Sequence, residues 1–141
     1  MWNVISSSAS IYKAKLDPEG IGGYCRMDES ISNPTWDQVK VLFEGVDGYC
    51  CTEMDMEGPK RYYMTIGGGP DRFAVTVIGD DMGPCELLGP DSSDETSSIM
   101  LGGVKSDLPR RFIALRDQVI QAAQYFYHHG KLDPALNWHL D

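Results

Sequence analysis

Three short stretches of turn-forming residues constrain this fold more than any other feature of the sequence. They read EGPK, IGGGPD and GDDMGP, and they occupy residues 57–60, 66–71 and 79–84. The segments beside them are short and either apolar or alternating, which is typical of strands. Because the intervals are too short to hold a crossover helix, consecutive strands are expected to be antiparallel. The predicted strands are residues 48–54, 61–66, 72–78 and 85–88, with a further candidate at residues 9–16.

A first helix is predicted before these strands, over about residues 34–45. Asn33 and Pro34 suit a helix start. Thr35 with Gln38 offers a second possible capping box. Apolar residues then recur every three to four positions and give the helix one buried stripe. These residues are Trp36, Val39, Phe43 and Val46.

A second, longer helix is predicted over about residues 113–129, and Gly130 supplies its stop. Its apolar residues at helical spacing are Leu115, Val119, Ala122, Ala123 and Phe126. Residues 89–98, with the sequence GPDSSDETSS, are polar and are predicted to form a long mobile loop. An early short helix and a longer C-terminal helix, packed with an antiparallel meander of about four to six strands, define an α+β fold. We expect one domain over residues 1–141.

The charge is strongly acidic. The chain has 21 Asp and Glu against 12 Lys and Arg, a net charge of −9, so nucleic acid and anionic membranes are disfavoured as direct partners. Six acids and no Lys or Arg lie between Phe73 and Val104. This segment is either a solvated surface or a binding site for a basic protein. The candidate partner-binding residues are Asp80, Asp81, Glu86, Asp91, Asp94 and Glu95.

Sequence features that would mark secretion or membrane insertion are not found. No run approaches the roughly 20 apolar residues of a membrane span, and the N-terminal MWNVISSSAS does not resemble a secretory signal. The four cysteines form no CxxC pair and fit small reduced thiols better than a disulfide framework. They are Cys25, Cys50, Cys51 and Cys85. We therefore expect a cytoplasmic protein.

The glycine-rich stretch at residues 66–73, IGGGPDRF, does not match a phosphate-binding loop. A Walker loop needs GxxxxGK[ST] before a helix, and a dinucleotide loop needs GxGxxG between a strand and a helix. This stretch instead joins two predicted strands. It is therefore predicted to be a hairpin turn.

The sequence also carries no recognisable catalytic constellation. HExxH and GxSxG are both missing. The zinc-deaminase signature fails because no histidine gives HxE and Cys85 has no second cysteine of a PCxxC motif. His128 and His129 are interpreted as cationic residues at a helix end. We expect a protein that is not an enzyme, with no catalytic residue, no metal site and no cofactor.

Three blocks of the sequence resemble the immunity proteins of bacterial polymorphic toxin systems, specifically the first-numbered immunity (Imm) family. The blocks are NPTWDQVKVLFEGVDG, YYMTIGGGPDRFAVTV and VIQAAQYFYHHGKLDPALNWHLD, and they span most of the chain. The closing pattern is the most specific part. The positions that the resemblance marks as family signature or structural residues are Trp36, Gly68, Gly69, Phe126, Gly130, Pro134 and Trp138.

The resemblance implies a small α+β protein without catalysis that binds a cognate secreted toxin and protects the producing cell and its kin. We hypothesise a one-to-one complex in which this protein blocks the active site or substrate cleft of the toxin. Family members are associated particularly with toxins of the deaminase superfamily. Residues 1–30 and 79–98 match none of the quoted blocks and are candidates for partner specificity. Three alternatives stay open. They are immunity against a nuclease or another basic toxin, a small ligand-binding domain or enzyme that uses the glycine hairpin, and a structural subunit.

Overall fold

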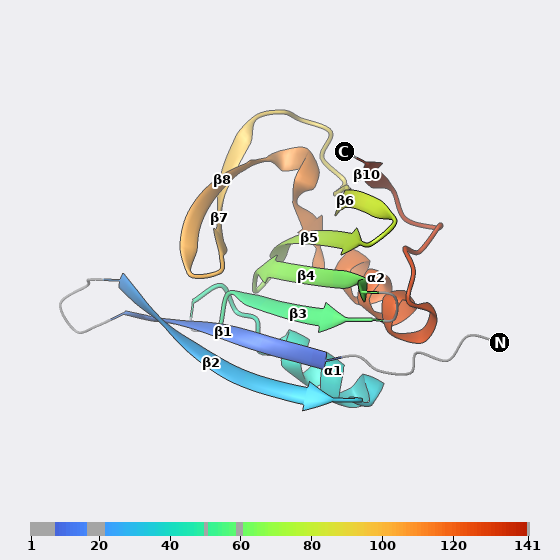
Figure 1. The fold of residues 1–141 in the computed structure, drawn as a ribbon. Coiled ribbons are helices and arrows are strands. Elements are labelled where there is room, and N and C mark those ends of the chain that lie inside the picture. Colours follow the sequence, from blue (N-terminus) through green and yellow to red (C-terminus); the bar gives the residue numbers. More distant parts are fainter. Residues whose placement is uncertain (1–7, 17–21, 50, 59–60, 141) are drawn as a thin grey trace.

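One antiparallel sheet and two helices form most of the chain in the computed structural model, which describes residues 8–16, 22–49, 51–58 and 61–140 (Figure 1). Within these residues the sheet has eight strands, in the order β10-β6-β5-β4-β3-β1-β2, and β9 pairs with β5. The strands are β1 Ser8–Leu16, β2 Gly22–Ser32, β3 Glu53–Glu57, β4 Tyr63–Gly68, β5 Arg72–Gly79, β6 Met82–Leu87, β9 Ala114–Leu115 and β10 Trp138–Leu140. Cys50 and the first seven residues of the chain lie outside the described residues.

The predicted α+β class and the antiparallel meander are confirmed. Strands β3, β4, β5 and β6 pair consecutively and antiparallel. The candidate strand at residues 9–16 is β1, which pairs with β3. The sheet continues beyond the predicted strands because β2 pairs with β1 at one side and β10 pairs with β6 at the other.

The strand predicted at residues 48–54 begins later than expected, at Glu53. The carboxylate of Asp47 accepts hydrogen bonds from the backbone N–H groups of Tyr49 at 2.9 Å and Cys51 at 3.0 Å. An aspartate that bonds its own following backbone favours a turn over a strand. The segment after the first helix is therefore a turn, and β3 starts only where this turn ends.

The first helix, α1, spans Trp36–Glu44 and starts at the alternative capping box. The Thr35 hydroxyl accepts the Gln38 N–H at 3.2 Å, and the Gln38 side chain accepts the Thr35 N–H at 2.9 Å. Asn33 is therefore not the cap. The cap at Thr35 fixes which face of α1 points inward, with Val39 and Phe43 buried.

The second helix, α2, spans Arg116–His129, three residues shorter at its start than predicted. Residues 114 and 115 form β9 instead, where Ala114 pairs with Phe73 in β5. Ala114 is fully buried, so its burial and its pairing in the sheet outweigh its helix propensity. Gly130 ends α2 in the left-handed conformation with φ of 65°, as predicted.

The polar segment at residues 89–98 is not a loop throughout. Its last residues belong to β7, Thr96–Leu101, which pairs with β8, Val104–Pro109, to form a separate two-stranded hairpin. The turn between them is Gly102–Gly103, and both glycines have positive φ. This is the two-glycine turn that favours a hairpin, and it outweighs the polar composition of the segment. A 3₁₀ turn, η2 at Arg110–Phe112, leads from β8 towards α2.

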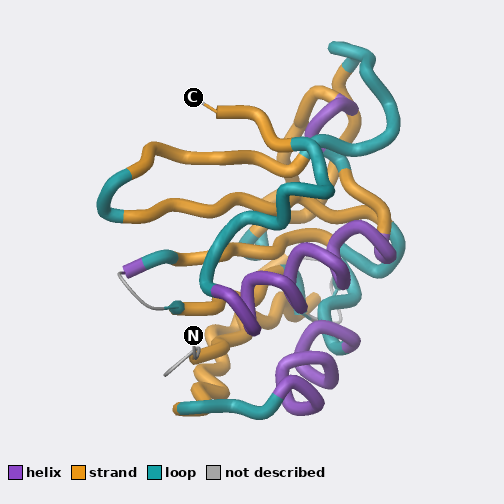
Figure 2. The backbone as a smooth tube through the Cα atoms, turned by 90° about the vertical axis from the view of Figure 1, so that its right-hand side faces the viewer, coloured by secondary structure: helices purple, strands orange, loops and turns teal. Residues whose placement is uncertain are grey.

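The apolar core lies between the two helices and one face of the sheet (Figure 2). Phe43 of α1 meets Phe73 of β5 with ring centroids 5.0 Å apart. Phe126 of α2 is 1% exposed in the same cluster. Alternate residues of each strand face the other way. The fold therefore leaves one sheet face that neither helix covers.

Candidate functional site

The sheet face opposite the two helices, here called the open face, carries a row of polar side chains. The strand register places Thr65 opposite both Asp55 and Thr76, and places Glu86 opposite both Thr76 and His139. The row therefore crosses five strands. The residues that the register places on this face include Glu53, Asp55, Glu57, Tyr63, Thr65, Gly67, Arg72, Ala74, Thr76, Ile78, Glu86 and His139.

Strand β3 supplies most of the charge on this face. In its sequence EMDME the two methionines are fully buried, and the three acids alternate with them. This alternation is the sequence signal for a strand with one covered and one open face. Sequence reasoning missed it, because the predicted strand began five residues before β3 and ended three residues before its end, inside the pattern.

The carboxylate of Glu53 has an unusual environment at the end of this row. Burial, and to a lesser extent the nearby charge of Asp55, raise its pKa from the ordinary value of 4.5 to about 7. Both effects disfavour the charged form. A Cβ built on Gly102 would lie 3.7 Å from both Glu53 carboxylate oxygens, so the tip of the β7–β8 hairpin sits close above this side chain.

An exposed apolar pair interrupts the acids. Tyr63 of β4 and Ile78 of β5 are direct cross-strand partners, and they are 44% and 47% exposed. The Tyr63 hydroxyl donates to Oε1 of Glu57 at 3.3 Å, and the charge of Glu57 is the main cause that raises the pKa of Tyr63. An aromatic ring beside a branched side chain, rimmed by acids, is the composition of an interface anchor.

The six acids singled out in the sequence do not form one cluster. Asp80 and Asp81 lie in the turn between β5 and β6, where Asp81 accepts a hydrogen bond from the Tyr62 hydroxyl at 2.5 Å. This bond is the main cause that raises the pKa of Tyr62. Glu86 lies on the open face. The remaining three, Asp91, Asp94 and Glu95, lie in the loop at the other end of β6.

Arginines from a later part of the chain approach this loop. Asp94 forms an ion pair with Arg111, and Glu95 forms one with Arg110 at 3.5 Å. The segment without basic residues is therefore not a continuous negative surface in the fold, because basic residues 110 and 111 are close in space. The surface around this loop is therefore less negative than the sequence of the loop indicates. The carboxylates of the open face make that face the more acidic of the two surfaces.

The glycine hairpin, residues 66–71, joins β4 to β5 as predicted. Its glycines pack against the turn that follows α1. A Cβ on Gly69 would lie 2.2 Å from the carbonyl oxygen of Val46, and one on Gly48 would lie 2.2 Å from that of Gly69. The Gly68 N–H donates to the Thr52 carbonyl at 3.0 Å. Gly68 and Gly69 therefore hold two backbone segments together.

The other positions marked by the resemblance lie in the core or the C-terminal tail. The ring of Trp36 lies 5.9 Å from that of Tyr127. Trp138 packs against the core from β10, and its indole N–H donates to the Asp133 carbonyl at 3.1 Å. Pro134 is exposed beside Asp133. These contacts give Trp36 and Trp138 a structural role.

Asp133 itself was missed in the sequence, although it is 6% exposed. Its carboxylate accepts hydrogen bonds from the Gln121 side chain at 3.0 Å and from the Ala135 N–H at 2.8 Å. It thereby organises the turn between α2 and β10. A sequence signal existed in the pair Asp133 and Pro134, because aspartate before proline favours a turn.

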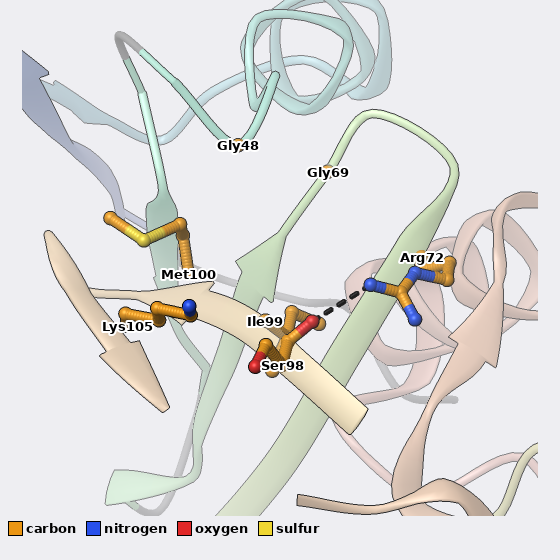
Figure 3. A pocket seen from close by; sticks show the side chains of 7 residues that line it. All are labelled: Gly48, Gly69, Arg72, Ser98, Ile99, Met100 and Lys105. Atoms are coloured by element: carbon orange, nitrogen blue, oxygen red, sulfur yellow. Dashed lines mark hydrogen bonds between the residues drawn. The ribbon is translucent and has the colours of Figure 1, made fainter. Parts of the chain in front are cut away.

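A cavity of about 220 Å³ lies between the glycine hairpin and the β7–β8 hairpin (Figure 3). We call it the Arg72 cavity. Arg72 donates to the Ser97 hydroxyl at 2.7 Å and to the Ser98 carbonyl at 2.8 Å, which ties β5 to β7. The lining residues are Gly48, Gly69, Arg72, Ser98, Ile99, Met100 and Lys105. A second depression of about 170 Å³ lies on the other side of Arg72, beside Arg110 and Leu115.

The described part of the chain contains no group of three or more His, Cys, Asp and Glu side chains that could hold a metal ion. In the same residues, every helix is too short or too polar to cross a membrane. Cys51 and Cys85 are buried free thiols. No protein-family model matches the chain, and no curated protein matches it significantly.

Proposed function

We propose that this protein is a non-catalytic inhibitor that binds a basic protein partner through its open face, as an immunity protein binds its toxin. The observation that carries the proposal is the composition of this face. Carboxylates from β3 and β6 flank the exposed pair Tyr63 and Ile78. Acids around a small apolar centre suit a protein partner better than a small molecule.

The charge of the chain supports the same kind of partner. A net charge of −9 attracts basic surfaces at long range and accelerates association. Enzymes that act on nucleic acid have basic clefts, in which carboxylates compete with phosphates for Lys and Arg. The family resemblance favours a deaminase-type toxin in the cytoplasm of the producing cell. A nuclease or another basic toxin is the alternative target, and the chemistry of the partner distinguishes the two.

The first test is capture and rescue. The full chain is used to isolate its partner from the native cells, and the partner is identified and expressed in a host with and without this protein. A stoichiometric complex together with restored growth of the host supports the proposal. A captured partner that is not toxic, or toxicity that persists despite a stable complex, overturns the immunity function.

A second test places the interface, by exchanging charges on opposite sides of the fold. Glu57→Lys with Glu86→Lys changes the open face, whereas the matched control Asp37→Lys with Glu44→Lys makes the same charge change on exposed positions of α1. We expect the first pair to slow association strongly and to reduce its salt dependence. Equal losses in the two double variants would place the interface elsewhere.

A further inference from the structure

We propose that the Arg72 cavity binds a small oxyanion, such as a phosphate or carboxylate group. The cavity is lined by two cations, Arg72 and Lys105, and by no carboxylate. This lining is the reverse of the chain as a whole, in which acids outnumber bases by 21 to 12. The proposal is separate from the partner of the open face and does not depend on it.

The guanidinium of Arg72 is held in place for this role. Two of its five N–H donors bond to Ser97 and Ser98 of β7. The other N–H donors of Arg72 have no partner among the residues that the structure describes. A planar guanidinium fixed by part of its donors loses little conformational entropy when the rest bind a ligand. Figure 3 shows Arg72 at one side of the cavity, with the Ser98 carbonyl bonded to it.

Lys105 supplies the second charge from β8. It is exposed, and it has no hydrogen-bond or ion-pair partner among the described residues. Figure 3 places it at the opposite side of Ile99 and Ser98 from Arg72. The Ser98 hydroxyl donates to Asp107 at 2.9 Å, so the two cations are the main donors for a ligand.

The wall formed by the β7–β8 hairpin is anchored on the sheet. The Gly103 N–H donates to the buried hydroxyl of Thr52 at 2.6 Å. Ile99 and Leu101 lie against the two glycines that end β4, because a Cβ on Gly68 or Gly67 would meet their side chains at 2.7 Å and 2.6 Å. The backbone that carries Lys105 is therefore fixed on the sheet before any ligand binds, and the guanidinium of Arg72 is fixed by its bonds to β7, which favours binding.

The size of the cavity limits what it can hold. Pockets for drug-sized ligands have about 300–1,000 Å³, whereas this one has about 220 Å³. It can take a phosphate or carboxylate group with a few attached atoms, but not a whole nucleotide. In this proposal the glycine hairpin forms one wall of an anion site.

The test is a titration of the full chain with inorganic phosphate, and separately with acetate, followed by backbone amide NMR at constant ionic strength. We expect saturable shifts at Gly48, Gly69, Met100 and Lys105 with at least one of the two anions. The anion that binds more tightly identifies the group that the cavity prefers. Unsaturable or scattered shifts with both anions overturn the proposal.

Matched charge variants distinguish anion binding in the cavity from general charge attraction. Lys105→Glu and Lys40→Glu make the same charge change at exposed positions, inside and outside the cavity. We expect Lys105→Glu to weaken binding about tenfold, and Lys40→Glu to leave the affinity nearly unchanged. Arg72→Lys, which keeps the charge and removes the planar donors, is expected to weaken binding as well. Equal effects of the two glutamate variants would refute the site.

Discussion

Replacing Glu53 with glutamine should stabilise this protein in alkaline solution but not in acid. In the unfolded chain Glu53 has the ordinary pKa of 4.5, and in the fold its pKa is about 7. Between these two values the folded state binds more protons than the unfolded state, so its stability falls as the pH rises. Above about pH 7 the whole loss is present, because the folded protein must then hold a charged carboxylate beneath the β7–β8 turn.

The size of this loss follows from the same two values. At about 1.36 kcal/mol per pKa unit, the difference corresponds to about 3.4 kcal/mol for a fully buried group. Glu53 is only half-buried, and solvent screens it, which reduces the expected loss to about 1–2 kcal/mol. Glutamine has nearly the same shape and stays neutral at every pH, so Glu53→Gln removes the loss without leaving a cavity.

The assay is urea unfolding of the native sequence and of Glu53→Gln, at about pH 3.5, below the unfolded pKa, and at about pH 8.5. We expect nearly equal stabilities at the lower pH and a gain of about 1–2 kcal/mol for the variant at the higher pH. Glu57→Gln, two residues along the same strand and exposed, serves as the control. A gain that is the same at both pH values, or a variant that is less stable in alkali, would refute the reasoning.

Two further predictions concern the packing of the fold. Trp138→Ala should lower the free energy of unfolding by about 2–3 kcal/mol, because it removes the ring from the core and the indole bond to Asp133. Denaturant unfolding measures this loss, and Trp138→Phe should recover part of the lost stability. Gly69→Ala should lower it by about 2–4 kcal/mol, because φ is 97° and the new Cβ would lie 2.2 Å from the Val46 carbonyl oxygen. Gly45→Ala, at φ of −79°, is the control and should cost less than about 1 kcal/mol in the same assay. Equal losses at Gly69 and Gly45 would contradict the close approach of Gly69 to the Val46 carbonyl.

The parts of the fold that were predictable from the sequence are those governed by local chemistry. The end of α2 at Gly130 and the hairpin at the glycine stretch needed only nearby residues. The two-glycine turn at residues 102–103 was also a local signal, but the polar residues before it masked the strand. The start of β3 depended on one side chain, because Asp47 turns the chain before the strand begins.

The candidate sites were less predictable because they depend on contacts between distant residues. The charge of the acidic loop is reduced by Arg110 and Arg111, which lie outside the window in which charges were counted. The Arg72 cavity exists because β7 folds back to within hydrogen-bond distance of β5, 25 residues earlier. The open face is the exception. Its alternating acids in β3 were visible, and a correct register for that strand would have revealed them.

The short strand β10 has a consequence for solubility. It pairs with β6 through Trp138 and Leu87, and the Leu88 N–H donates to the Asn137 carbonyl at 2.9 Å. Without this cover, the backbone of β6 would form an unpaired margin of the sheet, and such margins recruit strands from other molecules into aggregates. The three residues of β10 therefore replace the longer margin of β6 with a very short edge strand, and any fusion placed at this end must leave their pairing intact.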